Sequence, residues 1–379
     1  MMNFRDLKKQ YDALKQEIDA EIAEVIESSQ FISGGKVHEL EERLAECVGR
    51  KYCVSCANGT DALEMMLRAW NIGENDAVFV PSFTFMSTAE VVSLTGAMPF
   101  FVDIEPETFN MDSESLESAI KMVLEQGIYK PKAVIPVDLF GQPADFIRIQ
   151  AIADRYGLLV LEDGAQGFGG SIAGKKACSF GNASTTSFFP AKPLGCYGDG
   201  GAIFTDSEEE MLMLRSLCVH GKGKEKYENI RIGRNSRLDS LQAAVLLPKL
   251  KAFWDYELQA VNDAAEKYTS LLKDFVVVPT VKRNFRSSWA QYTVLCTDAE
   301  QRKLLQQFLK SSGIPSMVYY PLGLHQQQAF AGCGFQNRPL PVTEVMTKRV
   351  LSLPMHPYLS DAEIEHVSEQ VKNFMKGIK

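Results

Sequence analysis

Short apolar segments alternate with helical segments along the first two thirds of the chain, and this alternation most constrains the fold. Seven apolar segments have the composition of strands, at residues 52–55, 77–80, 99–102, 133–137, 158–161, 185–189 and 201–204. Amphipathic or helix-forming segments lie between them at 37–48, 61–70, 88–95 and 146–156. Strands that are apolar on both faces and separated by helices are typical of a parallel sheet covered on both sides. We therefore predict an α/β fold with a mostly parallel seven-stranded sheet flanked by helices.

The pattern changes after about residue 250 of the 379-residue chain. A long helix over 241–272 reads as a connector, and strands are expected at 291–295 and 316–319 with helices at 299–310 and 361–375. An amphipathic helix is also expected over 4–27. This organisation predicts a large domain over 1–250, which includes the N-terminal helix, and a small C-terminal α+β domain over 251–379.

Composition and charge exclude several classes of protein. The chain has 40 Lys and Arg against 48 Asp and Glu, which gives a net charge of −8 and argues against a nucleic-acid binder. No apolar run approaches the roughly 20 residues that span a bilayer, and the first residues lack the apolar core of a signal peptide. The eight cysteines lack zinc-ligand spacing, since Cys53 and Cys56 have no second pair. We expect a cytoplasmic enzyme with no membrane segment and no metal site.

Ligands of parallel α/β folds bind beyond the carboxyl ends of the strands, so polar residues that follow strands are candidate site residues. Lys192 follows the segment 185–189, lies between Pro190 and Pro193, and is followed by several glycines. A lysine held in such a turn can form a Schiff base with a carbonyl, most often that of pyridoxal 5′-phosphate (PLP). Taken alone, a structural lysine in a turn is the commoner explanation.

Three further segments follow strands of the same predicted sheet. Asp163 could keep the pyridine nitrogen of PLP protonated, or could cap a helix. Gly59 and Thr60 begin a helix and could bind a phosphate with their N–H groups, or form a plain cap. Phe85 could stack on a flat ring, or belong to the core. Together the four segments predict a PLP site, because packing alone seldom produces this combination.

The same segments carry a resemblance to a known family. The chain resembles the DegT/DnrJ/EryC1/StrS family of nucleotide-sugar aminotransferases, which are fold-type I PLP-dependent transferases. The similarity runs from FRDLKKQY at residue 4 through CANGTDAL, PSFTF, EDGAQ, SFFPAKPLGCYGDGGAIFT and NSRLDSLQAAVL to LPMHP at residue 353. The lysine segment is most similar to the subgroup that aminates UDP-2-acetamido-2-deoxy-3-oxo-D-glucuronate at C3 for surface-polysaccharide (O-antigen or lipopolysaccharide) biosynthesis.

The resemblance implies a transamination (EC 2.6.1.-) from L-glutamate and a role for each matching residue. Lys192 would carry PLP and move protons, and Asp163 would pair with the pyridine nitrogen. The remaining cofactor contacts would come from Gly59, Thr60, Phe85, Ala165, Gln166 and Ser187, and from Asn235 of the second subunit of a homodimer with shared active sites. Substrate contacts are expected from Ser29, Phe31, Arg237, Tyr319 and Tyr320.

Two departures from the family pattern lie at the expected sugar site. Ala191 replaces a frequent serine before the lysine, and Tyr319 replaces the histidine of a frequent His-Tyr-Pro. A third, Gly164 in place of alanine, lies in the EDGAQ segment. The alternatives are therefore another UDP- or dTDP-linked 3-keto or 4-keto-6-deoxy sugar, a PLP sugar dehydratase, which has His at the lysine position, and a non-catalytic PLP-binding regulator.

Overall fold

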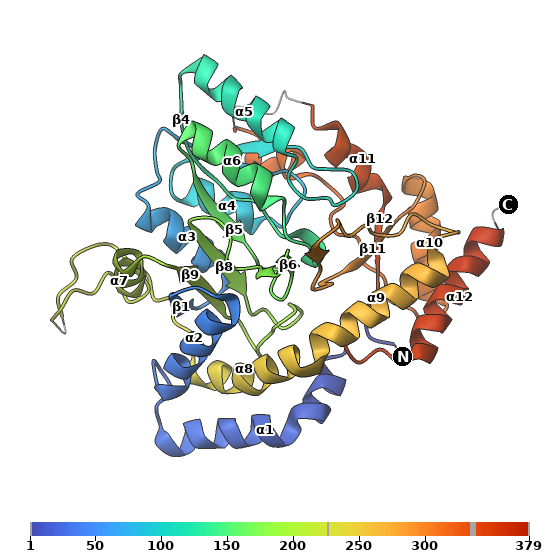
Figure 1. The fold of residues 1–379 in the computed structure, drawn as a ribbon, viewed down its shortest axis with the longest axis horizontal. Coiled ribbons are helices and arrows are strands. Elements are labelled where there is room, and N and C mark those ends of the chain that lie inside the picture. Colours follow the sequence, from blue (N-terminus) through green and yellow to red (C-terminus); the bar gives the residue numbers. More distant parts are fainter. Residues whose placement is uncertain (1, 226, 334–338, 378–379) are drawn as a thin grey trace.

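A seven-stranded sheet forms the centre of the computed structural model, which describes residues 2–225, 227–333 and 339–377 (Figure 1). Its strand order is β1-β9-β8-β5-β4-β2-β3. The strands are β1 (Tyr52–Cys56), β2 (Asp76–Pro81), β3 (Met98–Val102), β4 (Lys130–Val134), β5 (Leu159–Asp163), β8 (Ala183–Ser187) and β9 (Gly201–Thr205). The predicted number of strands is confirmed, and the largest boundary error is at β4, which ends three residues earlier than expected.

The sheet is mostly parallel, as predicted, with one reversed strand. β2 pairs in parallel with β3 and β4, β4 with β5, and β5 with β8. β9 is antiparallel to both of its neighbours, β1 and β8. The chain therefore turns back after β8, and the connection 188–200, which includes Lys192, lies at the carboxyl end of β8.

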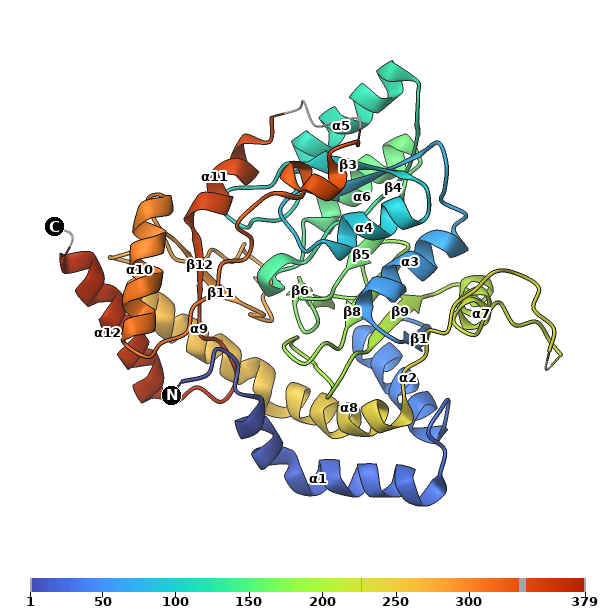
Figure 2. The same cartoon turned by 180° about the vertical axis from the view of Figure 1, so that it is seen from behind.

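Helices cover both faces of the sheet (Figures 1 and 2). One face packs against α3 (Gly59–Ala69), α4 (Ser87–Leu94) and α7 (Glu208–Leu217). The other packs against α2 (Gly35–Val48), α5 (Ser113–Gln126), α6 (Phe146–Tyr156) and α8 (Ser240–Ala252). Strand side chains on both faces are buried, which is the pattern the apolar segments predicted.

The C-terminal part has a separate two-stranded antiparallel sheet of β11 (Tyr292–Leu295) and β12 (Val350–Leu353). It is flanked by α10 (Ala299–Ser311), α11 (Pro341–Arg349) and α12 (Asp361–Gly377). The strand expected at 316–319 was wrong: only Met317 bridges to Ser352, so the segment touches the sheet edge at one residue. The expected connector is confirmed as α8, a π-helical turn at Phe253–Glu257 and α9 (Leu258–Leu272), which follow one another without a break.

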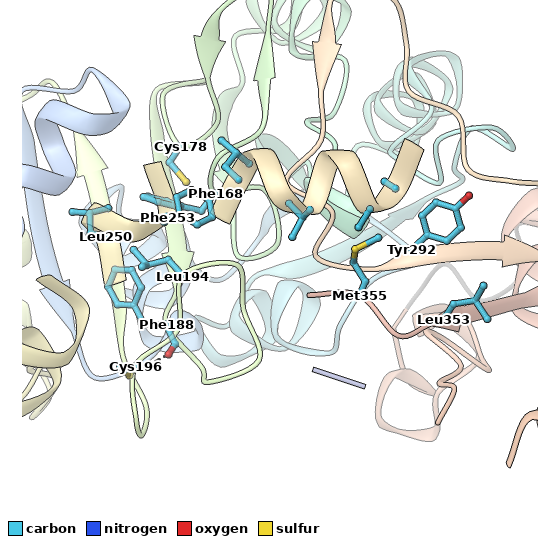
Figure 3. Packing of buried hydrophobic residues seen from close by; sticks show 14 of the residues in the cluster. Phe168, Cys178, Phe188, Leu194, Cys196, Leu250, Phe253, Tyr292, Leu353 and Met355 are labelled. Carbon is cyan, nitrogen blue, oxygen red and sulfur yellow. Dashed lines mark hydrogen bonds between the residues drawn. The ribbon is translucent and has the colours of Figure 1, made fainter. Parts of the chain in front are cut away.

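One hydrophobic cluster follows this connector through the molecule. Figure 3 shows Phe188, Leu194 and Cys196 packing near α8, and Tyr292, Leu353 and Met355 toward the other end of α9. The cluster therefore joins the segment around Lys192 to the C-terminal sheet. The division into domains at residue 250 stays a prediction.

Two segments lie at the edges of the fold. α1 (Leu7–Ser28) packs along α8, and the residues before it run toward the C-terminal part (Figure 1). The segment that follows α7 extends away from the rest of the molecule, which both views show (Figures 1 and 2). Among the helices of the described residues, none is both long and apolar enough to cross a membrane.

Candidate active site

A cavity of about 800 Å³ opens at the carboxyl ends of the central strands. Its walls come from the segments after β1, β2, β5 and β8 and from residues 319–320. Ten of the expected site residues line it: Gly59, Thr60, Phe85, Asp163, Ala165, Gln166, Ser187, Lys192, Tyr319 and Tyr320. The structure thus brings together residues from five separate segments, as a site at the strand ends requires.

Lys192 lies in a tightly folded turn. Its backbone N–H donates to the carbonyl of Phe189 at 2.8 Å, and the Cys196 N–H donates to the carbonyl of Phe188 at 2.8 Å. Gly195 lets the turn close, because a Cβ at that position would lie 2.5 Å from the carbonyl oxygen of Pro190. Among the described residues the Lys192 amine has no hydrogen-bond partner, so it is positioned by its backbone and free to react.

Burial and two charged neighbours act on the pKa of Lys192. Burial lowers the pKa of Lys192, the carboxylate of Asp163 raises it, and the guanidinium of Arg5 lowers it again. A lysine with a lowered pKa is a better nucleophile and base near neutral pH. The structure therefore supports the chemistry that the sequence predicted for this residue.

Asp163 ends β5 and is only 5% exposed. Its two carboxylate oxygens accept hydrogen bonds from the Thr88 hydroxyl at 2.8 Å and from the Ala165 N–H at 3.2 Å. Burial raises the pKa of Asp163, and the Thr88 hydroxyl and the charge of Lys192 oppose this. The carboxylate is thereby oriented into the cavity by two donors and remains able to pair with a cation.

The N-terminus of α3 supplies backbone donors. Asn58 caps the helix by accepting from the Asp61 N–H at 2.8 Å. Among the described residues, the N–H groups of Gly59 and Thr60 have no acceptor, and the Thr60 hydroxyl contacts that of Ser87 at 2.7 Å. A Cβ on Gly59 would lie 2.7 Å from the Cβ of Ser187, so glycine lets the two loops meet. The arrangement suits an anion at a helix N-terminus.

Gln166 and the aromatic residues form the opposite wall. The Gln166 Oε1 accepts from the Phe140 N–H at 2.8 Å, and its Nε2 donates to the Tyr320 hydroxyl at 3.3 Å. The rings of Phe85 and Tyr320 have centroids 6.5 Å apart. Phe85 is 55% exposed, so its ring is available to a ligand and is no part of the core.

Sequence reasoning missed some residues of this site. Thr88 contacts Asp163 from α4, a helix whose start was expected at that residue, and nothing in the sequence links the two. Ser87 and Gln291 also line the cavity, and the Oε1 of Gln291 is buried with no hydrogen-bond partner. Of these residues, only Asn58 could have been expected from the sequence. An Asn just before a helical segment, with Asp61 in the first turn, is typical of a helix N-terminus.

Four expected residues lie outside this cavity. Ser29 ends α1, and Phe31, which is 44% exposed, accepts from the Ser240 N–H through its carbonyl at 2.9 Å. Asn235 bridges to Val219 at the base of the extended segment, and Arg237 lies two residues further on. The bridge between Ile32 and Asp239 brings the segment of Ser29 and Phe31 beside the segment that carries Arg237, and none of the four residues lines the cavity of Lys192.

The cavity is poor in positive charge. Among the described residues that line it, Lys192 is the only lysine, arginine or histidine, whereas three aspartates, Asp61, Asp163 and Asp199, also line it. A phosphorylated ligand there would meet helix N–H groups at α3 and, among the described lining residues, no arginine. Within the described residues no group of three or more His, Cys, Asp or Glu could hold a metal ion.

Comparison with known proteins gives matches along nearly the whole chain. The model of the DegT/DnrJ/EryC1/StrS aminotransferase family matches residues 12–372. The UDP-2-acetamido-2-deoxy-3-oxo-D-glucuronate aminotransferase of Pseudomonas aeruginosa is 46% identical over 373 residues, which cover 98% of this chain and 100% of that protein.

Solved structures agree in fold. A DegT/DnrJ/EryC1/StrS aminotransferase from Brucella abortus has a TM-score of 0.96 and 47% identity, with 99% of each chain covered. NtdA from Bacillus subtilis, with its bound cofactor pyridoxamine phosphate (PMP), has a TM-score of 0.87 and 27% identity, covering 98% of this chain and 83% of that one. The predicted cofactor is confirmed at the level of the family.

The residues of the cavity fit that cofactor. The free N–H groups of Gly59 and Thr60 suit its phosphate, the oriented carboxylate of Asp163 suits its pyridine nitrogen, and the unpartnered amine of Lys192 suits its aldehyde. These groups line one continuous space, and Phe85 presents an exposed ring to it.

Proposed function

The chain belongs to the DegT/DnrJ/EryC1/StrS aminotransferase family, and from this premise we propose that it aminates UDP-2-acetamido-2-deoxy-3-oxo-D-glucuronate at C3 with L-glutamate as the amino donor. The observation that carries the proposal is the 46% identity to the P. aeruginosa enzyme over the full length of both chains. The presence of a lysine, Lys192, at the predicted cofactor position agrees with transamination.

PLP supplies the electron-accepting ring that lets an amino group leave glutamate and enter a keto sugar. The chain's residues would do the rest. Asp163 would hold a proton on the pyridine nitrogen, because its carboxylate is fixed by Thr88 and Ala165. Lys192 would move a proton to and from the carbon being changed, and its lowered pKa suits a base at neutral pH. The N–H groups at the start of α3 would hold the phosphate.

We also propose that the protein is a homodimer in which each subunit contributes residues to the other's cavity. The cavity's scarcity of cations contrasts with a substrate that carries a diphosphate and a carboxylate. Asn235 and Arg237 lie outside the cavity of their own chain, at the base of the segment that extends from the molecule (Figures 1 and 2). We place them in the cavity of a second subunit, where Asn235 would reach the cofactor phosphate and Arg237 the sugar. Ser29 and Phe31 would enter the same cavity of the second subunit, because the bridge from Ile32 to Asp239 keeps their segment beside that of Arg237.

The sugar itself is the least constrained part. Tyr319 and Tyr320 line the cavity and would contact the sugar ring, and Ala191 leaves room where the family often has a serine. Another UDP- or dTDP-linked keto sugar is the alternative, because these departures lie on the substrate side. We also place the enzyme in the cytoplasm, in the synthesis of a surface polysaccharide.

The test is a reaction of purified protein, PLP, UDP-2-acetamido-2-deoxy-3-oxo-D-glucuronate and glutamate labelled with nitrogen-15. We expect the label at C3 of the sugar, located by mass spectrometry and NMR. Label at C4, or turnover only of a neutral keto sugar, would replace the proposed substrate. An oxo sugar without nitrogen would indicate a dehydratase, and binding of PLP without turnover across UDP- and dTDP-linked keto sugars would indicate a regulator.

A further inference from the structure

The N-terminal segment before α1 is held between the C-terminal part and the turn that carries Lys192. The Phe4 carbonyl accepts from the Met355 N–H at 3.2 Å, and the Phe4 ring meets the edge of the Tyr319 ring with centroids 6.2 Å apart. Asp6 caps α1 by accepting from the Lys9 N–H at 3.0 Å. Arg5 lies between these two anchors, so its backbone is fixed on both sides.

Arg5 reaches the residue next to Lys192. Its Nη2 donates to the carbonyl of Pro193 at 3.2 Å. Among the described residues this is its only hydrogen bond, and none of their carboxylates lies within 4.0 Å of it. An arginine in a partly buried place usually pairs with an acid. Here the guanidinium instead lies near Lys192, and its positive charge interacts with that of the lysine amine.

The charged surroundings of both residues come from several elements. Lys192 is faced by Asp163 of β5 and by Arg5 of the N-terminal segment. Burial lowers the pKa of Arg5 to about 10, against the opposing effect of Glu257, so Arg5 stays charged at neutral pH. The other charged or titratable groups that interact with Arg5 are Lys249 of α8 and His356, which follows β12.

Glu257 does not neutralise Arg5 by direct contact. Its carboxylate accepts from the Gln10 amide at 2.9 Å and from the Tyr358 hydroxyl at 2.6 Å, which occupies it with other donors. Lys249, which is completely buried, donates to the Gly195 carbonyl at 2.8 Å on the same turn as Lys192. Two cations therefore hold backbone carbonyls of this turn, and Arg5 is the one whose partner adjoins Lys192.

We propose that Arg5 is a positioning residue for Lys192: it holds the carbonyl that follows the lysine and places a second cation beside the turn that carries it. A like charge nearby disfavours a cation, and lysines next to another cationic group are more reactive at neutral pH. The inference rests on the proposed role of Lys192 as the residue that joins the cofactor. It adds a role for the N-terminal segment, which lies far from Lys192 in the sequence.

The experiment is a spectroscopic pH titration of the PLP-loaded protein. The visible absorbance reports the protonation of the nitrogen that joins Lys192 to the cofactor. In Arg5→Met, which removes the charge and keeps the length, we expect the midpoint to rise by about one pH unit. In Arg5→Lys we expect a midpoint close to that of the wild type. Lys8→Met is the matched control, because Lys8 is an exposed cation that pairs with Asp12.

The possible outcomes separate this inference from the proposed function. An unchanged midpoint in Arg5→Met, or an equal rise in Arg5→Lys and Lys8→Met, overturns the role of Arg5. Arg5→Gln keeps a donor for the Pro193 carbonyl and carries the same test if Arg5→Met does not fold. Borohydride reduction followed by peptide mass spectrometry shows separately whether the cofactor is joined to Lys192, so a failure at that step counts against the proposed function.

Discussion

At the residue scale, the site depends on a few side chains that hydrogen bonds hold in place around the cavity. Asp163 uses its oxygens to accept from Thr88 and Ala165, and Gln166 is fixed by Phe140. Lys192 is the exception, since only its backbone is held. An amine with no hydrogen-bond partner among the described residues can exchange a bond to the cofactor for a proton without breaking a structural contact.

Replacing Lys192 by alanine is expected to abolish transamination. The residue is both the proposed link to the cofactor and the proposed base, so the loss in kcat should exceed the roughly 10⁴-fold upper range of general base catalysis alone. The visible absorbance of the purified protein should change with it. Lys192→Arg is the control, because it keeps a cation in the cavity but cannot form the link. If Lys192→Ala retained activity within tenfold of wild type, another residue would be the base.

Replacing Thr88 by valine is expected to shift the acid limb of the pH–rate profile upward. The Thr88 hydroxyl stabilises the ionised form of Asp163, whose pKa burial already raises. Its removal raises the pKa of Asp163 further, by about one unit. In its proposed role Asp163 must be ionised to pair with the pyridine nitrogen, so activity should be present above that pKa and be lost as the pH falls through it.

The control for this profile is Thr95→Val. Thr95 follows the same helix, α4, and its hydroxyl donates to the Val92 carbonyl at 2.8 Å, away from Asp163. An unchanged acid limb in Thr88→Val, or the same shift in Thr95→Val, would show that the Thr88 hydroxyl does not act through Asp163.

At the element scale, the N-terminus of α3 couples folding to cofactor binding. Asn58→Ala removes the side-chain acceptor of the Asp61 N–H, and we expect a loss of about 1 kcal/mol in the free energy of unfolding. Because the neighbouring N–H groups are the proposed phosphate site, the affinity for PLP should also fall. Urea unfolding and fluorescence titration with PLP measure the two effects.

Asp112→Ala is the matched variant for this element. Asp112 caps α5 by accepting from the Ser115 N–H at 2.6 Å, and it does not line the cavity. It should lose similar stability and keep its affinity for PLP. If both variants lost PLP affinity equally, the effect of Asn58 would be one of general stability and the phosphate would bind elsewhere.

Local pattern could predict most elements but not how they end or pair. Apolar alternation identified the seven strands, because burial on both faces leaves a continuous apolar segment. The segment 316–319 has the same composition, yet only Met317 pairs with the small sheet, through Ser352 of β12. The reversal of β9 is equally absent from its sequence, because the direction of a strand depends on the path of the chain between strands.

At the scale of the whole molecule, local sequence pattern could place only the site residues that follow strands, whereas Tyr319 and Tyr320 were expected from the family resemblance alone. Lys192, Asp163 and Gly59 follow strands, and the sheet brings them together. Arg5 and Tyr319 reach the same region through tertiary packing between distant parts of the chain, which no local spacing encodes. The roles of Asn235 and Arg237 depend on quaternary structure, since their proposed site belongs to a second subunit.

The shared site can be tested by mixing two inactive variants. Lys192→Ala has lost its own lysine, and Arg237→Ala is expected to lose the contact that it makes in the partner's cavity. If sites are shared, each mixed dimer has one site with both defects and one intact site. Half of randomly mixed dimers are of this kind, so activity should return to about a quarter of the wild-type value.

The base of the extended segment offers a second variant, designed to break the proposed dimer. Ile232 and Ile230 are 84% and 56% exposed in the single chain, and two exposed apolar side chains on one short segment suit an interface better than a scattered single one. Ile232→Asp should give monomers by light scattering and should abolish the activity recovered by mixing. Lys222→Asp is the matched control for charge on the same segment. If the mixture of Lys192→Ala and Arg237→Ala stayed inactive while both variants formed dimers of normal stability, each chain would hold its own complete site, and the cations missing from the cavity would have to come from movement within one chain.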